Sequence, residues 1–461
     1  MASRFPSGAS HPFSVLWALF TSVVLLLPAA AVAGTITVPG DELTIQAAVD
    51  AANPSGDTIV VSPGTYPENV VIAGKDVVLR SVAPADPAIV RATIIDGGAA
   101  ATVVAVVDPV TSACEVAGLT IANGSAQAGG GIHAGDTLVS IRANVIVGNY
   151  AVNGAGVYRC NGTIEGNFIL YNEAQINGGG LMYCHGLIRN NLVARNTAQS
   201  YGGGLYSCDA AIENNTIAYN RVTDALGRGG GLSSSCGGCG ASITNCVFWG
   251  NFAFTAPHLH NTVWPTYSCI GDGTHGISTN IALDPRFVDS AQDDFRLRPS
   301  SPCIDAGFDT GLTLDFEGDP RPYGAGIDMG ADEAITHALT TAVLGIGSVL
   351  PYPGTRLYLD GATVEVTAAS FLGWQFSHWE GPATGSQNPL PVVMDQDKSV
   401  TAVFTPITSP DDPNGDGSQP SDQAFQCCAD PATTETNGAG IPYGCGVVLA
   451  LLWMAGRRTR R

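Results

Sequence analysis

A glycine-rich triplet recurs every 24 to 27 residues and limits most what this chain can fold into. The segments are GGGIHA from 129, GAGVYR from 154, GGGLMY from 178, GGGLYS from 202 and GGGLSS from 229. Each is followed by a copy of I-x-x-N-x-[hydrophobic]-x-x-N: IRANVIVGN, IEGNFILYN, IRNNLVARN, IENNTIAYN and, with Cys for the first Asn, ITNCVFWGN. Short alternating apolar runs indicate strands, and Gly and Asn indicate sharp turns.

Units of this length cannot bury their own apolar faces, so they must stack on one another as a solenoid. Equivalent residues of successive coils then lie about 4.8 Å apart in parallel strands. An inward apolar column is predicted at Ile141, Ile164, Ile188, Ile212 and Ile243. A ladder of side-chain amides at a turn is predicted at Asn149, Asn172, Asn196, Asn220 and Asn251.

Opposite charges alternate at the position after each of the first four isoleucines. The residues are Arg142, Glu165, Arg189 and Glu213, and they are predicted to form one outward column. Like charges directly opposed would destabilise the stack, whereas each alternating neighbour contributes about 0.2 to 1 kcal/mol. The alternation therefore supports the register of the coils.

The stack needs a cover at its N-terminal end. LTIQAAVDAA has apolar residues at helical spacing and is predicted to close that end. The apolar residues are Leu43, Ile45, Ala48, Val49 and Ala52. The segments that follow, GDTIVVSPGTY and ENVVIAGKDVVLRS, alternate as strands and turns.

The stretch TIQAAVDAA…GDTIVVSPGTYPENVVI…KDVVLRS resembles the entry of right-handed parallel β-helix proteins with a pectin-lyase-like fold. The resemblance implies an all-β chain, with a right-handed parallel β-helix of about ten coils over residues 34–290, followed by a small all-β module. It specifies the fold strongly and the activity weakly.

Residues 291–334 contain FRLRPSSPCIDAGFDTG and GIDMGADE, and are similar to the segment that ends many exported β-helices of surface-anchored bacterial proteins. This resemblance predicts a C-terminal capping segment. Its charged residues are expected to form a polar cap on the last coil: Asp305, Asp315, Asp319, Arg321, Asp328 and Glu333.

Residues 335–406 resemble the divergent internalin-type B repeat, a small all-β module of surface proteins. The likeness rests on GWQFSHWEG and MDQDKSVTAVF. In so small a module Trp374 and Trp379 are expected to fill the core rather than to form a sugar-binding platform.

Residues 1–33 are interpreted as a secretory signal, with Arg4 before an apolar run and AAAVAG offering cleavage after Ala33. Residues 407–440 are a linker rich in Pro, Asp, Gly, Ser and Thr. Residues 441–461, IPYGCGVVLALLWMAGRRTRR, resemble the tripartite C-terminal sorting signals of bacterial surface proteins. We therefore expect an exported protein, anchored in a membrane by this short hydrophobic segment.

The formal charge of −20 counts against nucleic acid and anionic polysaccharide as partners. Hydrolases need converging carboxylates, but the carboxylates of the regular coils are scattered: Asp136, Glu165, Glu173, Asp209, Glu213 and Asp224. Lyases need a base and a cation for the uronate, and the arginines of the coils alternate with glutamates. No catalytic, cofactor-binding or metal-binding residue is predicted, and the pattern weighs against an enzyme without deciding the question.

Twelve cysteines in an exported chain permit disulfides. Cys160, Cys184 and Cys208 share a column beside His185 and Asp209, which favours packing or disulfides over a catalytic thiol. The segment CGGC at 236–239, with Cys246 and Cys269, is interpreted as disulfides that staple an enlarged coil rather than as zinc ligands.

Two weaker metal motifs remain. His258 and His260 should lie on one strand face, with Asp272 and His275 as the only candidates for a third ligand. DPNGDG places Asp412, Asn414 and Asp416 as in a calcium loop, but Gln423 stands where a bidentate Glu is needed, so calcium is only a weak alternative to no cofactor.

The order of these segments favours a cell-surface-anchored, adhesin-like binding or structural module that meets glycans or partner surfaces. The alternative is a polysaccharide lyase or glycoside hydrolase with its site in residues 224–290, where the coil spacing grows from 24 to 31 residues.

Overall fold

The computed structural model describes residues 33–407, apart from residues 55, 238–240, 274–278 and 382–383. The predicted signal (1–33), linker (407–440), anchor (441–461) and calcium loop therefore lie outside the described residues, except for Ala33 and Ile407. Within the described part, no helix has the length and apolar character needed to cross a bilayer.

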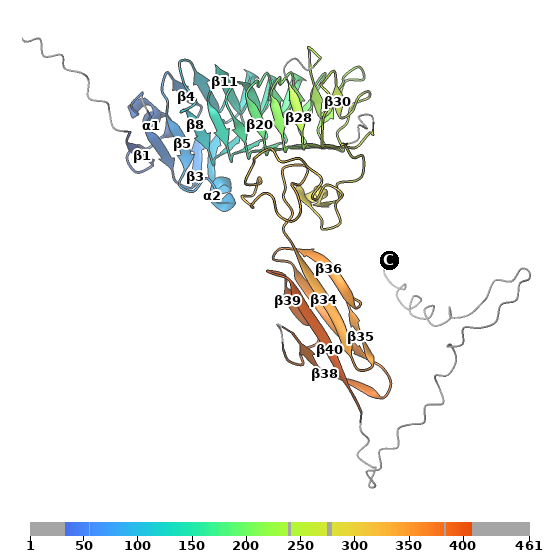
Figure 1. Ribbon diagram of the computed structural model, residues 1–461. Coiled ribbons are helices and arrows are strands. Elements are labelled where there is room, and N and C mark those ends of the chain that lie inside the picture. Colours follow the sequence, from blue (N-terminus) through green and yellow to red (C-terminus); the bar gives the residue numbers. More distant parts are fainter. Residues whose placement is uncertain (1–32, 55, 238–240, 274–278, 382–383, 408–461) are drawn as a thin grey trace, which may run out of the picture. The chain divides into compact units, whose positions relative to one another are not determined.

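Residues 35–270 wind into a right-handed stack of parallel strands, in which the successive coils lie side by side (Figure 1). The coils build four parallel sheets, which we name A to D. In the described residues sheets A and B have nine strands each, so the stack has about nine turns rather than the expected ten.

Sheet A is formed by β1 (Thr35–Val38), β2 (Thr58–Val61), β5 (Val78–Ser81), β8 (Glu115–Ala117), β12 (Ser140–Arg142), β16 (Ile164–Glu165), β20 (Leu187–Arg189), β24 (Ala211–Glu213) and β28 (Ser242–Thr244). Sheet B is formed by β3 (Gly64–Pro67), β6 (Thr93–Asp96), β9 (Thr120–Ala122), β13 (Val145–Val147), β17 (Phe168–Leu170), β21 (Leu192–Ala194), β25 (Thr216–Ala218), β29 (Val247–Trp249) and β31 (Cys269–Ile270).

Sheet C is formed by β4 (Val70–Ala73), β7 (Val104–Val107), β11 (Ile132–Thr137), β15 (Val157–Cys160), β19 (Leu181–Met182), β23 (Leu205–Tyr206), β27 (Leu232–Ser233) and β30 (Leu259–His260). Sheet D is formed by β10 (Ser125–Ala128), β14 (Tyr150–Asn153), β18 (Glu173–Asn177), β22 (Thr197–Ala198) and β26 (Arg221–Val222).

The predicted isoleucine column is confirmed. Ile141, Ile164, Ile188, Ile212 and Ile243 pair in register through sheet A, and each is at most 2% exposed. These side chains and their counterparts from the other sheets fill one continuous interior. The burial of this interior is the main stabilising contribution to the stack.

A helix closes the N-terminal end, as predicted. α1 (Ile45–Ala51) starts after Thr44, whose hydroxyl accepts a hydrogen bond from the Ala47 amide. Ile45, Ala48, Val49 and Ala52 are buried, but Leu43 is 81% exposed. The prediction for Leu43 is wrong because the helix begins only at Ile45, so Leu43 precedes the helical period.

The second helix, α2 (Pro87–Ala92), has no counterpart among the predicted elements. Asp86 caps it through the Ala88 amide, and Pro87 occupies its first turn. Of its six residues only Val90 is buried, so the segment carries too few periodic apolar positions to be recognised as a helix.

Two asparagine ladders run through the stack, one of them predicted. Along the predicted ladder, Nδ2 of Asn149, Asn172, Asn196 and Asn220 donates to Oδ1 of the next asparagine at 2.9 to 3.0 Å. The second ladder joins Asn144, Asn167, Asn191 and Asn215 at 2.9 to 3.1 Å. Each ladder satisfies buried backbone groups at a turn between sheets.

The charge column also has the predicted register. Arg142 pairs with Glu165, Glu165 with Arg189, and Arg189 with Glu213 on successive strands of sheet A. Glu165 accepts ion pairs from Arg142 at 3.1 Å and Arg189 at 2.9 Å. Glu213 has no ion pair among the described residues. The column is only partly open to solvent, since the Glu165 side chain is 18% exposed.

Replacing Arg189 by glutamate is expected to lower the free energy of unfolding by about 1 kcal/mol, because three acids would then occupy adjacent rungs. The loss should shrink at high salt. Exchanging Glu213 for arginine in the same protein should recover part of it, and Glu213→Gln alone should change little. Urea unfolding at low and high salt measures the free energy of unfolding of all three variants. If Arg189→Glu does not change this free energy at low salt, the charge column does not contribute to stability.

The predicted capping segment is not stacked on the end of the last coil. Residues 284–334, which we call the flank segment, lie along the outside of the stack (Figure 1). The segment accepts hydrogen bonds from three successive coils: from Asn190 to Leu314 O, from Asn214 to Asp328 O and from Asn245 to Phe308 O. It contains β32 (Phe287–Asp289), η1 (Ser290–Gln292) and β33 (Asp294–Leu297).

The physical reason is the apolar outer surface of sheet B. Its outward residues pack with apolar residues of the flank segment in a second core. Among its members are Leu192, Ala194, Ala218, Val247, Cys269, Phe295, Leu297, Cys303 and Met329. Sheet B is thus buried on both faces where the flank segment covers it, and every residue of strands β21 and β25 is buried.

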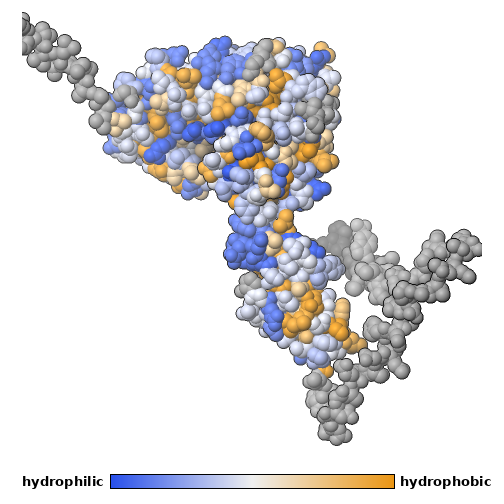
Figure 2. Space-filling view, viewed as in Figure 1, coloured by the Kyte–Doolittle hydropathy of each residue, from blue (hydrophilic) through white to orange (hydrophobic). Residues whose placement is uncertain are grey.

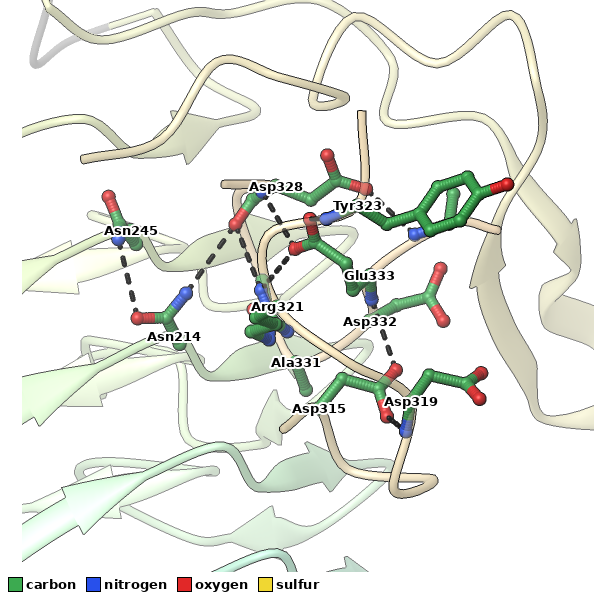
Figure 3. Close-up of polar contacts among 12 residues, drawn as sticks. Asn214, Asn245, Asp315, Asp319, Arg321, Tyr323, Asp328, Ala331, Asp332 and Glu333 are labelled. Carbon is green, nitrogen blue, oxygen red and sulfur yellow. Dashed lines mark hydrogen bonds and ion pairs between the residues drawn. The ribbon is translucent and has the colours of Figure 1, made fainter. Parts of the chain in front are cut away.

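The charged residues of the flank segment form a buried network around Arg321 (Figure 3). Arg321 pairs with Glu333 at 3.0 Å, and neither side chain is exposed. Burial and the nearby Glu333 raise the pKa of Asp328 to about 7. These groups hold together the turns of the segment itself, a structural role.

The C-terminal module pairs two antiparallel-rich sheets. One has the order β36 (Gly354–Leu359), β34 (Thr336–Leu344), β40 (Lys398–Pro406) and β38 (Trp374–Glu380). The other has the order β35 (Gly347–Leu350), β37 (Thr363–Ser370) and β39 (Leu390–Val393). Trp379 is fully buried, with Nε1 donating to Gln387 O, and Trp374 packs against the same core. Figure 2 shows apolar residues on the surface of this module. The Tyr352 side chain is also exposed, at 66%.

Candidate functional site

The outer face of sheet C carries the candidate site. One column on this face runs in register from coil to coil through His133, Tyr158, Met182, Tyr206, Ser233 and His260. Each alternates with a buried neighbour, such as Val157 before Tyr158 and Leu205 before Tyr206. Since successive side chains of a strand point to opposite faces, the column projects away from the core.

The aromatic members of this face and two neighbouring tyrosines form a continuous line of rings, which we call the aromatic stripe. Ring centroids are 5.2 Å apart for His133 and Tyr158, and 6.0 Å for Tyr158 and Tyr183. The line continues from Tyr183 to Tyr206, to Tyr201 and to His260 at 6.0 to 6.1 Å. All six are half-buried, so the rings are held in place and still reach solvent.

Backbone geometry helps to place Tyr183. Its φ is 54°, in the left-handed region, and Arg159 and Ser207 adopt the same conformation in the neighbouring coils. A non-glycine residue in this region costs about 1 kcal/mol, and such residues often mark functional positions. The Tyr183 amide donates to Tyr206 O at 3.1 Å, which fixes the two coils together at this point.

Polar groups border the stripe in pairs of opposite charge. Arg159 pairs with Asp136 at 2.9 Å and also lies 5.4 Å from the ring centroid of Tyr158. His185 lies 3.9 Å from Asp209. The stripe therefore has hydrogen-bonding groups along its edge without a strong excess of either charge.

The two histidines of the stripe are held neutral. Burial lowers the pKa of His133, and burial together with Arg228 lowers the pKa of His260. The His260 ring also contacts Ser233 Oγ at 3.0 Å and Arg228 at 3.3 Å. At neutral pH both rings therefore present an uncharged aromatic surface.

Such a face can bind a molecule with apolar C–H surfaces and many hydroxyls. The rings remove the C–H surfaces from water, and tyrosine hydroxyls and the bordering polar groups can satisfy the hydroxyls. Glycosidases of the usual kind need two carboxyl groups about 5 to 9.5 Å apart. Asp136 and Asp209 lie three coils apart, about 14 Å, and each is already bonded to a cation or histidine.

The cysteine column and the histidine pair do not form catalytic or metal sites among the described residues. Cys184 is fully buried, with its thiol bonded to Met182 O, so it does not face His185 and Asp209 as a nucleophile would. The expected common face for His258 and His260 is wrong: His258 is 5% exposed and contacts Asn251, the end of an asparagine ladder. The described residues contain no group of three or more metal-ligating side chains.

Cys246 and Cys269, expected in disulfides of the enlarged coil, are joined by a backbone hydrogen bond of 2.9 Å, but their side chains belong to different cores. Cys246 takes the position of a ladder asparagine and contacts Asn215, whereas Cys269 faces the flank segment. Cys239 and His275 lie outside the described residues.

The aromatic stripe was not predicted, although the sequence contains a signal for it. The second residue after each glycine triplet is, in chain order, His133, Tyr158, Met182, Tyr206 and Ser233.

A groove of about 360 Å³ lies on the other side of the stack, between α2, the charge column and residues 311–318. Its floor includes Glu165 and Arg189, which already pair with each other, and Phe168 lines its wall. The flank segment thus shields the charge column from solvent on one side.

Two family models match separate regions of the chain and agree with the architecture. Residues 105–269 match the right-handed beta helix region family, and residues 337–408 match the divergent InlB B-repeat domain. Among solved structures, pectate lyase Pel9A is 14% identical, with a TM-score of 0.34, over 63% of this chain and 90% of that one. No curated protein matches. The chain therefore contains a right-handed parallel β-helix, followed by a divergent InlB B-repeat domain.

Proposed function

We propose that this chain is an exported, cell-surface-anchored, adhesin-like protein whose β-helix binds a glycan along the aromatic stripe. The observation that carries the proposal is the unbroken line of six rings across the coils. Export and anchoring are supported by the apolar segments at the two ends of the sequence and by the B repeat between.

The stack suits a repeating ligand. Its rings recur at nearly constant intervals, fixed by backbone hydrogen bonds between coils, so little conformational entropy is lost when a chain binds across several of them. Each ring adds a weak contact, and contacts along one rigid face act together. An extended polysaccharide can contact several rings of the stripe at once, whereas a monosaccharide can contact only one or two.

The charge of the face favours a neutral glycan. The protein is strongly acidic overall, with a formal charge of −20. On the face, Asp136 neutralises Arg159 and the histidines of the stripe are uncharged. A polyanionic glycan would find no excess of cations there and would be repelled over longer range.

A glycan array that covers neutral and acidic polysaccharides tests this function. The double variant Tyr158→Ala/Tyr183→Ala is expected to bind the best neutral ligand roughly 10- to 30-fold more weakly, since each ring contributes about 1 kcal/mol. Tyr352→Ala removes a tyrosine ring of the B-repeat module that is more exposed than those of the stripe, and it should leave affinity unchanged.

Binding that survives in the double variant would refute the proposed face. Release of reducing ends or unsaturated products from a bound glycan would instead show that the chain is an enzyme. Surface display is tested separately: external protease should cleave the β-helix on intact cells, and its protection would contradict surface exposure.

A further inference from the structure

Most of the buried cysteines described by the structure lie inside the solenoid. Cys114, Cys160, Cys184, Cys208 and Cys246 belong to its interior core. Cys269 and Cys303 are different: both lie in the second core, between the outer surface of sheet B and the flank segment. Neither has any exposed surface.

The sequence positions of these two residues explain how they meet. Cys269 begins β31, on the last coil, in register with Val247 of β29, whose side chain faces the same core. Cys303 follows 34 residues later, in the flank segment, where its carbonyl accepts a hydrogen bond from the Met329 amide. The return of the flank segment along sheet B brings Cys303 back to β31.

Backbone hydrogen bonds place Cys303 beside the last coils. The Met329 amide donates to Cys303 O, and the next amide, that of Gly330, donates at 2.7 Å to the carbonyl of Asn245. Asn245 precedes Cys246, whose carbonyl accepts a hydrogen bond from the Cys269 amide.

The neighbouring Cys303 side chain and, second, burial raise the pKa of the Cys269 thiol. The Cys269 thiol donates to Leu283 O at 3.2 Å. Two thiols that are buried in the same core, on backbone segments linked by these hydrogen bonds, are placed to form a covalent bond.

We propose that Cys269 and Cys303 form a disulfide in the mature protein. Each thiol loses its proton, a bond forms between the two sulfur atoms, and two electrons pass to an oxidised disulfide such as oxidised glutathione, which is released as two thiols. Because both residues are fully buried in the folded chain, the exchange takes place before the flank segment closes over sheet B.

This bond would staple the flank segment to the end of the stack. The flank segment covers the apolar outer face of sheet B, so its detachment would expose that face. A cross-link that closes a loop of 34 residues restricts the unfolded chain and therefore favours the closed arrangement. The inference concerns the fold and does not depend on glycan binding.

Cys184 and Cys208 offer a competing pair, since both are buried in the interior core. They occupy equivalent positions of adjacent coils, where the spacing is about 4.8 Å. A disulfide needs Cβ atoms about 3.8 Å apart, so this pair would distort the stack. Cys303 belongs to no repeat, and its distance to Cys269 is not fixed by the coil spacing.

The test uses the full chain, refolded from denaturant in a mixture of reduced and oxidised glutathione, followed by titration of free thiols in denaturant. If the disulfide exists, Cys303→Ala should show one more free thiol than the unaltered protein, because Cys269 is released. The double variant Cys269→Ala/Cys303→Ala should show the same number as the unaltered protein. Cys114→Ala, which removes an interior thiol, should show one fewer.

Two free thiols at these positions would give the opposite pattern: one fewer in the single variant and two fewer in the double variant. That result would overturn the proposal. Peptide mapping of the unaltered protein without reductant gives an answer that needs no variant. A linked pair of peptides containing Cys269 and Cys303 is expected; a link between Cys184 and Cys208 in its place would also contradict the proposal.

Discussion

Replacing Asn196 by alanine is expected to lower the free energy of unfolding by about 4 kcal/mol. Asn196 is fully buried, and its Oδ1 accepts hydrogen bonds from the backbone and side-chain amides of Asn172. Its Nδ2 donates to Ile169 O and to Asn220 Oδ1. Alanine leaves several of these groups buried without partners, and each unsatisfied group costs about 1 to 3 kcal/mol.

Urea unfolding followed by far-ultraviolet circular dichroism measures this loss. Asn153→Ala is the matched control: Asn153 is half-buried and makes no side-chain hydrogen bond within the described residues. Its effect should stay within about 0.5 kcal/mol. Equal effects of the two substitutions would show that the ladder does not hold the coils together.

Replacing Gly204 by valine is expected to destabilise the β-helix by about 3 kcal/mol or more. A Cβ atom at this position would lie 2.6 Å from Gly231 O of the next coil and 3.2 Å from Ile217 Cγ2. Gly231 O accepts the hydrogen bond from the Leu205 amide, so the coils cannot separate without losing that bond. Overpacking of a closed core costs about 1 to 3 kcal/mol, and a lost backbone bond adds to it.

Gly64→Ala gives the comparison, because the atoms nearest to a Cβ at Gly64 belong to the Tyr66 side chain, at an ordinary contact distance of 3.5 Å. Thermal unfolding should show a large fall for Gly204→Val, or insoluble protein, and little change for Gly64→Ala. A stable Gly204→Val protein would mean that the glycine triplets do not serve close contact between coils.

The features that were predictable from sequence are those that every coil repeats. The isoleucine column, one asparagine ladder and the alternating charges need only the period of the repeat, because each coil offers its residue the same surroundings. The second ladder was present in the same pattern, at the Asn that follows each Ile by three residues, as in Asn167.

Features outside the period could not be placed in this way. The position of the flank segment depends on which outer face of the stack is apolar, and thus on sheet B as a whole. His258 turns inward because an asparagine ladder ends beside it, a local event that strand alternation does not describe. The aromatic stripe varies from coil to coil, so a search for identical residues passes over it.

Carbohydrate binding by the aromatic stripe is tested most directly by hydroxyl-radical footprinting of the tyrosines, with and without the best neutral polysaccharide from the array. Tyr158, Tyr183 and Tyr206 should become several-fold less reactive when the polysaccharide is bound, whereas Tyr352 of the B-repeat module should not change. Unchanged reactivity at all three stripe tyrosines, with the polysaccharide demonstrably bound, would contradict the proposed site.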